Sequence, residues 1–422
     1  MKYSAEIVLE RSYDVVVAGS GPAGIGAAIN AGRNGAKTLI IESMGRVGGV
    51  STAGLMSHFT GTVGNKTYHE VIRRASSKNI LQKASYNVNI DPELLTITYL
   101  EMLEEAGVDI LLYTSVCDVV MEGDKLCGVI CFNKSGFIKI NSKVVIDATG
   151  DGDVAQKSGA EFVLGREKDN KMQPATLMFK VGGVDMDRAV LPPSFETTVQ
   201  TPKGELQSLA REILPSPAGH VLLYPSPIPG VVTCNMTNAT DIDGTNADDL
   251  TRAEITCRKQ MEPIVRFLRE YAPGYENCYA LSSASLIGIR ETRHFKGVKT
   301  ITEEDILSAR QFEDAVVYGA LFNFDVHNIT GSGLDETGVQ NEFKQIKGYT
   351  IPYGCMVPEK IEGLLLSGRN ISGTHIAHSN FRAMPICMGI GEACGIASAI
   401  AVKKNVSVRN VLPGEIQEIN RI

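Results

Sequence analysis

The sequence predicts an α/β protein in which a parallel sheet with covering helices also carries an antiparallel β-meander, and into which an α+β domain is inserted. Three observations lead to this prediction. Short β-branched apolar runs, typical of buried parallel strands, occur near both ends of the chain, and a glycine-rich turn joins the first of them to a helix-like segment. The middle third instead has Pro and Gly clusters and longer polar helices. With 422 residues, 43% of them hydrophobic and 21% charged, the chain can bury the cores of two or three domains.

Composition limits the function classes. The formal net charge of −7 gives no overall positive field for holding DNA or RNA. No uninterrupted apolar run approaches the roughly 20 residues of a membrane span, and the N-terminal segment lacks the apolar stretch of a signal peptide. Nine cysteines, an odd number without paired spacing, fit a reducing compartment. We therefore expect a cytoplasmic protein without a nucleic-acid partner, a membrane partner or a metal site.

The N-terminal residues have the pattern of a β-α-β unit. Tyr13–Ala18 is a short β-branched run that predicts a buried strand. After the glycine-rich turn, Ala23–Asn34 is expected to form a helix that Gly35 closes, and Lys37–Glu42 a second buried strand.

The next segments predict the rest of the first sheet. We expect a helical excursion near residues 60–106, including a helix at Pro92–Ala106, and then a strand at Val108–Tyr113. Val116–Val145 reads as three short strands separated by two turn sequences, which is the pattern of an antiparallel meander. Val144–Ala148 is predicted to be a further buried strand.

The chain divides into three parts on this reading. Residues 1–164 would form the first part of a nucleotide-binding domain, residues 165–348 an inserted substrate domain, and residues 349–422 the second part of the first domain. In the last part, Gly363–Ser367 resumes the buried-strand pattern. Pro385–Val402 is small, apolar and helical, and because it contains Glu392 we expect a buried helix rather than a membrane span.

The glycine-rich turn has the pattern GxGxxG, directly after a strand and opening a helix. The first glycine permits a tight turn, the second lets the backbone approach a pyrophosphate, and the third lets helix and strand pack closely. Glu42 ends the second strand about 20 residues downstream, where a carboxylate accepts hydrogen bonds from a ribose diol, which disfavours NADP. The predicted dinucleotide contacts are Gly19, Gly21, Pro22, Ala23, Gly24 and Glu42.

A second glycine pair follows this unit, within Ser43–Thr52. At this point the chain resembles the FAD-dependent oxidoreductase family of glutathione-reductase-like (Rossmann) flavoproteins, whose N-terminal pattern is a dinucleotide turn, a ribose-binding acid and a GG-x-[ST] loop. The resemblance implies a Rossmann-like FAD-binding domain, and it adds to the cofactor-binding residues Ser43, Arg46, Gly48, Gly49, Ser51 and Thr52.

Two more segments carry the resemblance. Asp147–Asp153 resembles the family's ATG stretch beside the adenosine end of FAD, and residues 364–395 resemble its final flavin-binding segment. The helix start near Pro385–Gly391 would face the flavin pyrimidine edge, where a positive helix terminus stabilises negative charge. Arg369 departs from the family, because many relatives have an acid there; an arginine could reach the pyrophosphate. The implied FAD contacts are Val116, Ala148, Thr149, Gly150, Gly368, Arg369, Pro385 and Met388.

The sequence favours non-covalent FAD and excludes a disulfide reductase. Some relatives tether the flavin through a histidine near the glycine pair, but the nearest one here, His58, lies beyond the loop and is expected to be a packed or surface residue. Cys127 and Cys131 lie about 13 Å apart along one predicted strand, too far for a disulfide. Cys387 is expected to be a core thiol that can lie close to the isoalloxazine.

Candidate catalytic residues come from the C-terminal flavin segment. His375 is the first candidate for an acid or base, because imidazole titrates near physiological pH. Arg382 could bind a substrate carboxylate or oxyanion, and His378 is a weaker candidate. A structural hydrogen-bonding role is equally compatible with each. Arg293, in the stretch IRETR that also resembles a family motif, would either belong to an ion-pair network or anchor an anionic substrate.

These residues predict a flavin enzyme that transfers a hydride between flavin N5 and a small organic substrate, including anionic ones, by alcohol or amine C–H oxidation or by reduction of an activated C=C bond. The alternative is a non-redox enzyme of the same fold that uses flavin or NAD, such as an isomerase or a biosynthetic or modification enzyme. A nucleotide-sensing protein is a third possibility. No pattern in the sequence predicts an oligomeric state.

Overall fold

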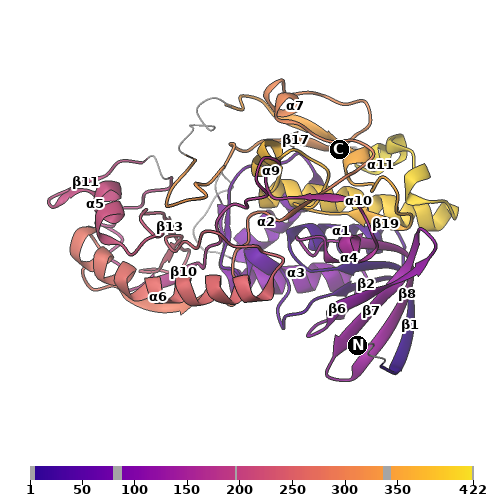
Figure 1. The fold of residues 1–422 in the computed structure, drawn as a ribbon, viewed down its shortest axis with the longest axis horizontal. Helices are drawn as coiled ribbons and strands as arrows, with labels where there is room; N and C mark the ends of the chain where they lie inside the picture. The colour runs from indigo at the N-terminus through magenta and orange to yellow at the C-terminus, as the bar shows by residue number, and fades with distance from the viewer. Residues whose placement is uncertain (1–4, 79–87, 195–196, 336–343, 421–422) are drawn as a thin grey trace.

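A computed structural model describes residues 5–78, 88–194, 197–335 and 344–420 (Figure 1). Its main sheet has seven strands, in the order β5 (Asp109–Leu111), β2 (Thr38–Ile41), β1 (Ile7–Ala18), β8 (Gly136–Asp147), β7 (Lys125–Asn133) and β6 (Ser115–Glu122), with β19 (Leu364–Leu366) also paired to β8. The strands β5, β2, β1, β8 and β19 pair in parallel, and β6, β7 and β8 form the antiparallel meander. The predicted α/β class, parallel sheet and meander are therefore confirmed.

One predicted boundary is wrong. The third meander strand and the separate strand expected at Val144–Ala148 are one continuous strand, β8, of 12 residues. Its first half pairs with β7 and its last residues pair with β19, while β1 runs in parallel along both halves. Although Asn141 and Ser142 are residue types that favour turns, both stay paired with neighbouring strands here, so the backbone continues as one strand. The strand β1 is also longer than predicted. It begins at Ile7, six residues before the predicted start, and its first half is exposed.

Helices cover the parallel part of the sheet. They are α1 (Pro22–Arg33), α2 (Lys66–Lys78), α3 (Pro92–Glu105) and α10 (Met384–Lys404), and they confirm the β-α-β unit, the helical excursion and the C-terminal helix. Asp91 caps α3, because its side chain accepts hydrogen bonds from the backbone N–H groups of Glu93 and Leu94. Gly35, with φ of +87°, follows α1 as predicted.

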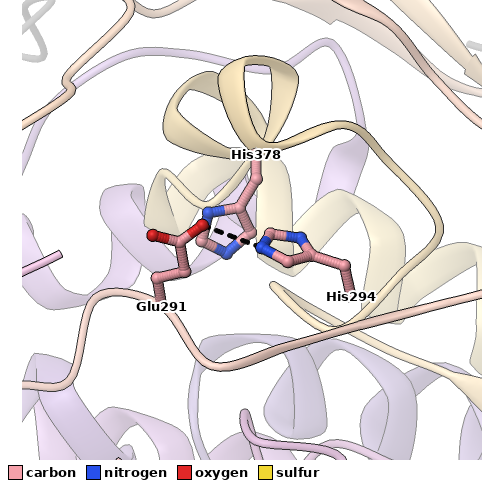
Figure 2. A group of neighbouring side chains, drawn as sticks. All are labelled: Glu291, His294 and His378. Atoms are coloured by element: carbon pink, nitrogen blue, oxygen red, sulfur yellow. Dashed lines mark hydrogen bonds and ion pairs between the residues drawn. The ribbon is translucent and has the colours of Figure 1, made fainter. Parts of the chain in front are cut away.

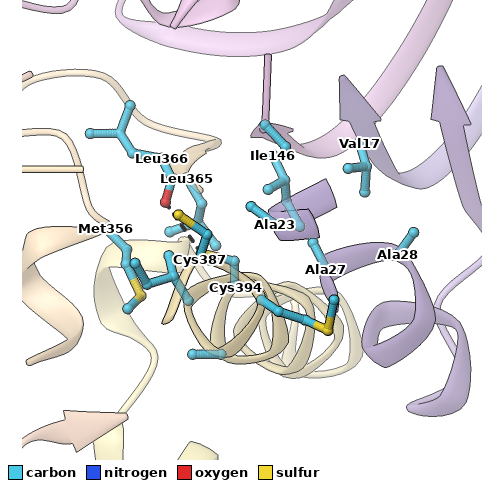
Figure 3. Packing of buried hydrophobic residues seen from close by; sticks show 14 of the residues in the cluster. Val17, Ala23, Ala27, Ala28, Ile146, Met356, Leu365, Leu366, Cys387 and Cys394 are labelled. Atoms are coloured by element: carbon cyan, nitrogen blue, oxygen red, sulfur yellow. Dashed lines mark hydrogen bonds between the residues drawn. The ribbon is translucent and has the colours of Figure 1, made fainter. Parts of the chain in front are cut away.

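Helix α10 is long and apolar enough to cross a membrane, but it is buried inside the protein against α1 (Figure 3). The two helices touch through their backbones. A Cβ atom added at Gly391 or Gly395 would overlap the carbonyl oxygen of Ala23 or of Ala27, and one added at Gly26 would lie 2.5 Å from that of Met388. Glycine is therefore required along this contact, which joins the two ends of the chain in one apolar core.

The middle of the chain forms a second, antiparallel sheet with its own helices. Its strand order is β13 (Leu223–Pro225), β14 (Val232–Cys234), β10 (Phe179–Gly182) and β15 (Tyr279–Ser283), accompanied by α5 (Leu206–Ile213), α6 (Ala247–Tyr271) and the short hairpin β11 (Gln200–Thr201) and β12 (Gly204–Glu205). Figure 1 shows α5 and α6 at the opposite end of the molecule from the meander. A separate apolar cluster that includes Phe179, Ile264 and Tyr275 supports this part.

The remaining helices and strand pairs lie outside the two sheets. They are the pairs β3 (His58–Phe59) with β4 (Val88–Asn89), β9 (Phe162–Leu164) with β16 (Arg293–Phe295) and β17 (Ala315–Ala320) with β18 (Tyr349–Pro352), and the helices α4 (Asp153–Lys157), α7 (Glu303–Leu307), α9 (His375–Phe381) and α11 (Pro413–Asn420). Apolar residues between Phe295 and Ile351 belong to the core of the seven-stranded sheet. The chain therefore returns to the first core well before its last strand.

Candidate active site

The glycine-rich turn lies between β1 and α1, and its three glycines have different surroundings. A Cβ atom at Gly19, where φ is +93°, would lie 2.5 Å from the carbonyl oxygen of Ala148, and one at Gly24 would overlap the carbonyl oxygen of Gly19. A Cβ atom at Gly21 would meet nothing within 4 Å. The first and third glycines are thus required by the protein's own packing, whereas the space beside the second is open for a ligand. Pro22 begins α1, and the buried Ala23 follows it.

Glu42 lies directly after β2 and faces this turn. Its carboxylate accepts hydrogen bonds from the backbone N–H and the hydroxyl of Ser20, at 3.1 and 2.6 Å, and from the hydroxyl of Ser43 and the N–H of Met44, at 3.1 and 2.9 Å. The Glu42 carbonyl accepts from the N–H of Thr114, two residues before Val116 on β6. Ser43 and the start of β6 therefore lie close to Glu42, the carboxylate that the sequence predicts to bind a ribose.

The second glycine pair packs against the turn. Gly48 and Gly49 have φ of +105° and +51°, and a Cβ atom at Gly49 would lie 3.0 Å from Cα of Gly21. Ser51 and Thr52 hold the loop, because each hydroxyl donates a hydrogen bond of 2.6 Å to a loop carbonyl, of Gly48 and of Val47. The loop offers its backbone to the same open space. Arg46, by contrast, forms an ion pair with Glu93 at 2.5 Å.

The ATG stretch and the end of β19 meet the turn at the same sheet edge. Ala148 N–H donates to the Ala18 carbonyl, and Ser367 N–H to the Asp147 carbonyl, both at 2.9 Å. Thr149 donates to the Asp147 carboxylate through its backbone and its hydroxyl, at 3.1 and 2.7 Å. Burial raises the pKa of Asp147 to about 6. The carboxyl ends of three parallel strands thus converge, which is where open α/β sheets bind ligands.

Arg369 and Arg293 both bind the acidic end of this stretch. Arg369 forms an ion pair with Asp151 and lies against Gly150, whose φ is +86°. Arg293 donates to the Asp151 carbonyl at 2.8 Å and pairs with Asp153 at 2.9 Å. Of the two roles expected for Arg293, the ion-pair network is the one the structure contains. A pyrophosphate contact of Arg369 stays a prediction.

Several buried polar atoms without a hydrogen-bond partner lie together in one C-terminal segment of the described chain. Buried polar side-chain atoms nearly always have a hydrogen-bond partner. Yet one segment, residues 367–382, has five buried atoms without a partner among the described residues: Ser367 Oγ, Arg369 Nε, Asn370 Oδ1, His378 Nδ1 and Arg382 Nε. Gly368, with φ of +105°, lies within it, and a Cβ atom there would be 3.0 Å from the Ala23 side chain. This segment therefore offers polar groups beside the dinucleotide turn.

The N-terminus of α10 completes this region. The helix follows Ala383, which gives no side-chain cap, and Pro385 lies in its first turn. Pro385 and Met388 are buried there. An uncapped, buried helix start presents partial positive charge, which suits the anionic edge of a bound flavin. Cys387 is a buried thiol in the same turn, and burial raises its pKa to about 12.

His375 begins α9 and forms a pair with Glu291. Its Nδ1 lies 2.5 Å from Glu291 Oε1, which also accepts a hydrogen bond from His294 Nε2 at 2.8 Å. The Gln173 N–H donates to the other oxygen at 3.2 Å. Burial favours the neutral form of Glu291, but the bonds from His294 and His375 outweigh it and hold the pKa of that carboxyl below its ordinary value. The 15% exposed His375 is thus fixed by an ionised carboxylate, with Nε2 on the opposite side of its ring.

His378 belongs to the same group but is buried. Its ring packs edge-on against that of His294, with centroids 4.6 Å apart (Figure 2). Burial and the neighbouring His294 hold the pKa of His378 well below its ordinary value, so the imidazole is neutral. His378 therefore supports the site rather than meeting solvent.

Arg382 follows the last turn of α9 and lies beside a second acid, the half-buried Asp325. It binds Asp325 through the carbonyl and the carboxylate, at 2.8 and 2.9 Å. Burial would raise the pKa of Asp325, but the charges of His327, Arg382 and Arg290 outweigh it and lower it. Burial and Arg382 lower the pKa of Arg290 to about 10, which still leaves it cationic at neutral pH.

Gln173 joins the two groups. Besides its N–H bond to Glu291, its side-chain oxygen accepts from the His327 N–H at 3.1 Å and lies 3.5 Å from Arg382 Nη2. Its side-chain nitrogen Nε2 is buried and has no partner within the described part of the chain. Gln173, Glu291, His294 and Asp325 were not among the predicted site residues. They come from three separate stretches of the chain, with Glu291 and His294 in one of them, and Glu291 was visible only as the acid between two arginines.

His58 and the cysteines, which the sequence predicts to be neither a flavin tether nor a disulfide, are packing residues or free thiols in the structure. His58 is buried, its ring stacks on Tyr224 with centroids 4.0 Å apart, and burial lowers its pKa. All nine cysteines lie in the described part of the chain as free thiols. Cys131 is buried in the meander, as expected of a packing residue, while Cys127 lies nearer the surface.

The fold and the turn together define a dinucleotide-binding flavoprotein of the Rossmann type. A sequence model described as FAD dependent oxidoreductase matches residues 14–420, so the chain belongs to this family and binds FAD. We expect this cofactor at the glycine-rich turn, Glu42, the Gly48–Gly49 pair and the segment 367–382.

Individual relatives are more distant. A thiamine thiazole synthase from Methanococcus vannielii is 34% identical over 152 residues, 32% of this chain and 56% of that protein. A digeranylgeranylglycerophospholipid reductase from Methanococcoides burtonii is 27% identical over 197 residues, 43% of this chain and 47% of that protein. The matches thus span about half the length of these relatives. A myxobacterial chondrochloren halogenase shares the fold, with a TM-score of 0.50 and 12% identity over 97% of this chain and 79% of that chain.

Proposed function

We propose that this FAD-dependent oxidoreductase transfers a hydride between flavin N5 and a small organic substrate, with His375 moving the accompanying proton. When bound, FAD supplies the group that accepts or donates a hydride. The observation that carries the proposal is the His375–Glu291 pair, because His375 lies in the segment 367–382 that bears the unpaired atoms. We also propose that FAD is held without a covalent bond, because the His58 ring is occupied in packing against Tyr224. A cytoplasmic location is a separate proposal, which rests on the sequence.

Glu291 would determine which nitrogen of His375 reacts. An ionised carboxylate accepts a hydrogen bond from Nδ1–H and so keeps that proton on Nδ1. This leaves Nε2 as the atom that takes a proton from an alcohol or amine, or returns one to a reduced C=C bond. The same carboxylate stabilises the imidazolium that forms when Nε2 takes a proton. His375 is thus proposed as the catalytic residue and Glu291 as the residue that positions it.

Arg382 and Arg290 would favour an anionic substrate. The buried Arg290 and the half-buried Arg382 both lower the pKa of one half-buried carboxylate, that of Asp325, so cationic groups outnumber acidic ones around it. Arg382 Nε and Gln173 Nε2 are buried donors that have no partner among the residues the structure describes. A substrate carboxylate or oxyanion would supply both the missing charge and the missing acceptors.

The proposal is tested by anaerobic bleaching of the flavin with candidate alcohols, amines and NAD(P)H. Once a substrate is found, His375→Asn should keep the yellow colour but slow bleaching by roughly 10²–10⁴-fold, the usual contribution of acid–base catalysis. Glu291→Gln removes the carboxylate that holds His375 Nδ1, so it should also slow bleaching, by less than His375→Asn does, while the yellow colour is kept. His69→Asn, whose ring contacts only the Val63 carbonyl in the hydrogen bonds of the structure, is the matched control. Bleaching by His375→Asn at the rate of the control would remove His375 from the reaction.

The similarity to a thiamine thiazole synthase supports one alternative, a biosynthetic enzyme of this fold without net redox turnover. Such an enzyme would show no substrate-driven bleaching. A purified chain that retains NAD instead of FAD would favour it over the hydride-transfer proposal.

A further inference from the structure

Glu291 also belongs to a compact group of three side chains, all of types that bind metal ions. Glu291, His294 and His378 are 0%, 6% and 1% exposed, and one donor atom from each lies within 4.8 Å of the other two. Figure 2 shows the Glu291 carboxylate and the His294 ring directed toward each other, with the His378 ring beside them. Glu291 and His294 are three residues apart at the start of β16, and His378 comes from α9.

The group is incompletely satisfied by protein atoms. Glu291 and His294 share one hydrogen bond of 2.8 Å, but Nδ1 of His294 and Nδ1 of His378 are buried without a partner among the described residues. A buried imidazole nitrogen without a partner carries an energetic cost that a ligand would remove. The group therefore contains buried ring nitrogens whose hydrogen-bonding capacity the described residues leave unused.

The donor set and the spacing fit a divalent metal ion. Ligand distances of about 2.0–2.2 Å place neighbouring donors roughly 3–4 Å apart, so the group needs only a small contraction from 4.8 Å. Two imidazoles and one carboxylate suit first-row ions such as Zn²⁺ and Fe²⁺ rather than Mg²⁺ or Ca²⁺, and three protein ligands leave a coordination position open for water or substrate.

We propose that Glu291, His294 and His378 bind one divalent first-row transition-metal ion. The ion would replace the proton shared by Glu291 and His294 and would be one ligand away from His375, which contacts the same carboxylate oxygen. It would thereby fix the Glu291 carboxylate that contacts His375. The site is defined by protein ligands alone, so it does not depend on the flavin reaction.

The test measures zinc binding to the FAD-loaded chain. The protein is stripped with a chelator, loaded with Zn²⁺, freed of excess metal and assayed for zinc and flavin per chain, with affinity measured by calorimetry. The wild type should retain about one zinc ion. Loss of one ligand in Glu291→Gln or His378→Gln should weaken binding by at least the roughly 10–100-fold typical of outer-shell changes. His69→Gln should bind zinc as the wild type does.

Zinc-edge X-ray absorption of the wild type provides a measurement that does not rely on the variants folding. Two imidazole ligands and one carboxylate are expected. The proposal is overturned if the wild type retains neither Zn²⁺ nor, under anaerobic conditions, Fe²⁺, if the cluster variants bind zinc as tightly as His69→Gln, or if the absorption spectrum lacks the imidazole ligands. Flavin content is recorded separately, so a chain that binds zinc without FAD would contradict the proposed function and leave the metal site standing.

Discussion

Glu291 connects most of the candidate site at the scale of single residues. Its two carboxylate oxygens receive bonds from His294, His375 and the Gln173 backbone, which come from three segments of the chain. The sequence predicted His375 and Arg382 because both lie in a recognisable flavin segment. It did not predict their partners, Glu291 and Asp325, because an isolated acid in a loop has no spacing that distinguishes it from a surface charge.

Gly21 is the residue at which the cofactor, rather than the protein, requires glycine. Because its φ is not positive and an added Cβ atom meets nothing within 4 Å, Gly21→Ala and Gly21→Val should both fold. We expect Gly21→Val to weaken FAD binding by at least about tenfold, since its methyl groups enter the space left for the pyrophosphate, and Gly21→Ala to have a smaller effect. Flavin titration of the FAD-free protein measures this, with its thermal unfolding as a control. Equal affinity of Gly21→Val and wild type would place the pyrophosphate elsewhere.

At the scale of elements, the sequence predicted the units whose signals are local. The β-α-β unit and the meander have β-branched runs bounded by glycines, so their existence and order were confirmed. The continuity of β8 was not predictable, because a strand that leaves one partner, β7, and joins another, β19, is defined by distant pairing rather than by its own residues.

The contact between α1 and α10 should depend on glycine. A Cβ atom at Gly391 would overlap the Ala23 backbone, so Gly391→Ala must push apart the two helices and with them the start of α1 (Figure 3). We expect a loss of about 1–3 kcal/mol in the free energy of unfolding, as for overpacked cores. Gly414→Ala in α11 is the matched control, because a Cβ atom there meets nothing within 4 Å; it should be neutral or stabilising by up to about 1 kcal/mol. Denaturant unfolding compares the two. Similar stability of both variants would mean that the helices are not in backbone contact.

At the scale of the whole molecule, separate stretches of the chain build one cofactor site. Residues before 153 supply the turn, Glu42, the glycine pair and the ATG stretch, and residues 364–404 supply the unpaired atoms and the uncapped start of α10. The sequence indicated both groups through their motifs. It gave no indication that apolar residues between Phe295 and Ile351 pack on the core of the main sheet, because their pattern resembles that of any buried strand.

The most direct test of FAD bound without a covalent link along this path is the absorption spectrum of the purified protein before and after acid precipitation. We expect flavin bands in the intact protein and the release of all of the flavin, as FAD, into the acid supernatant. A colourless protein that retains NAD, or a precipitate that stays yellow, would contradict the account.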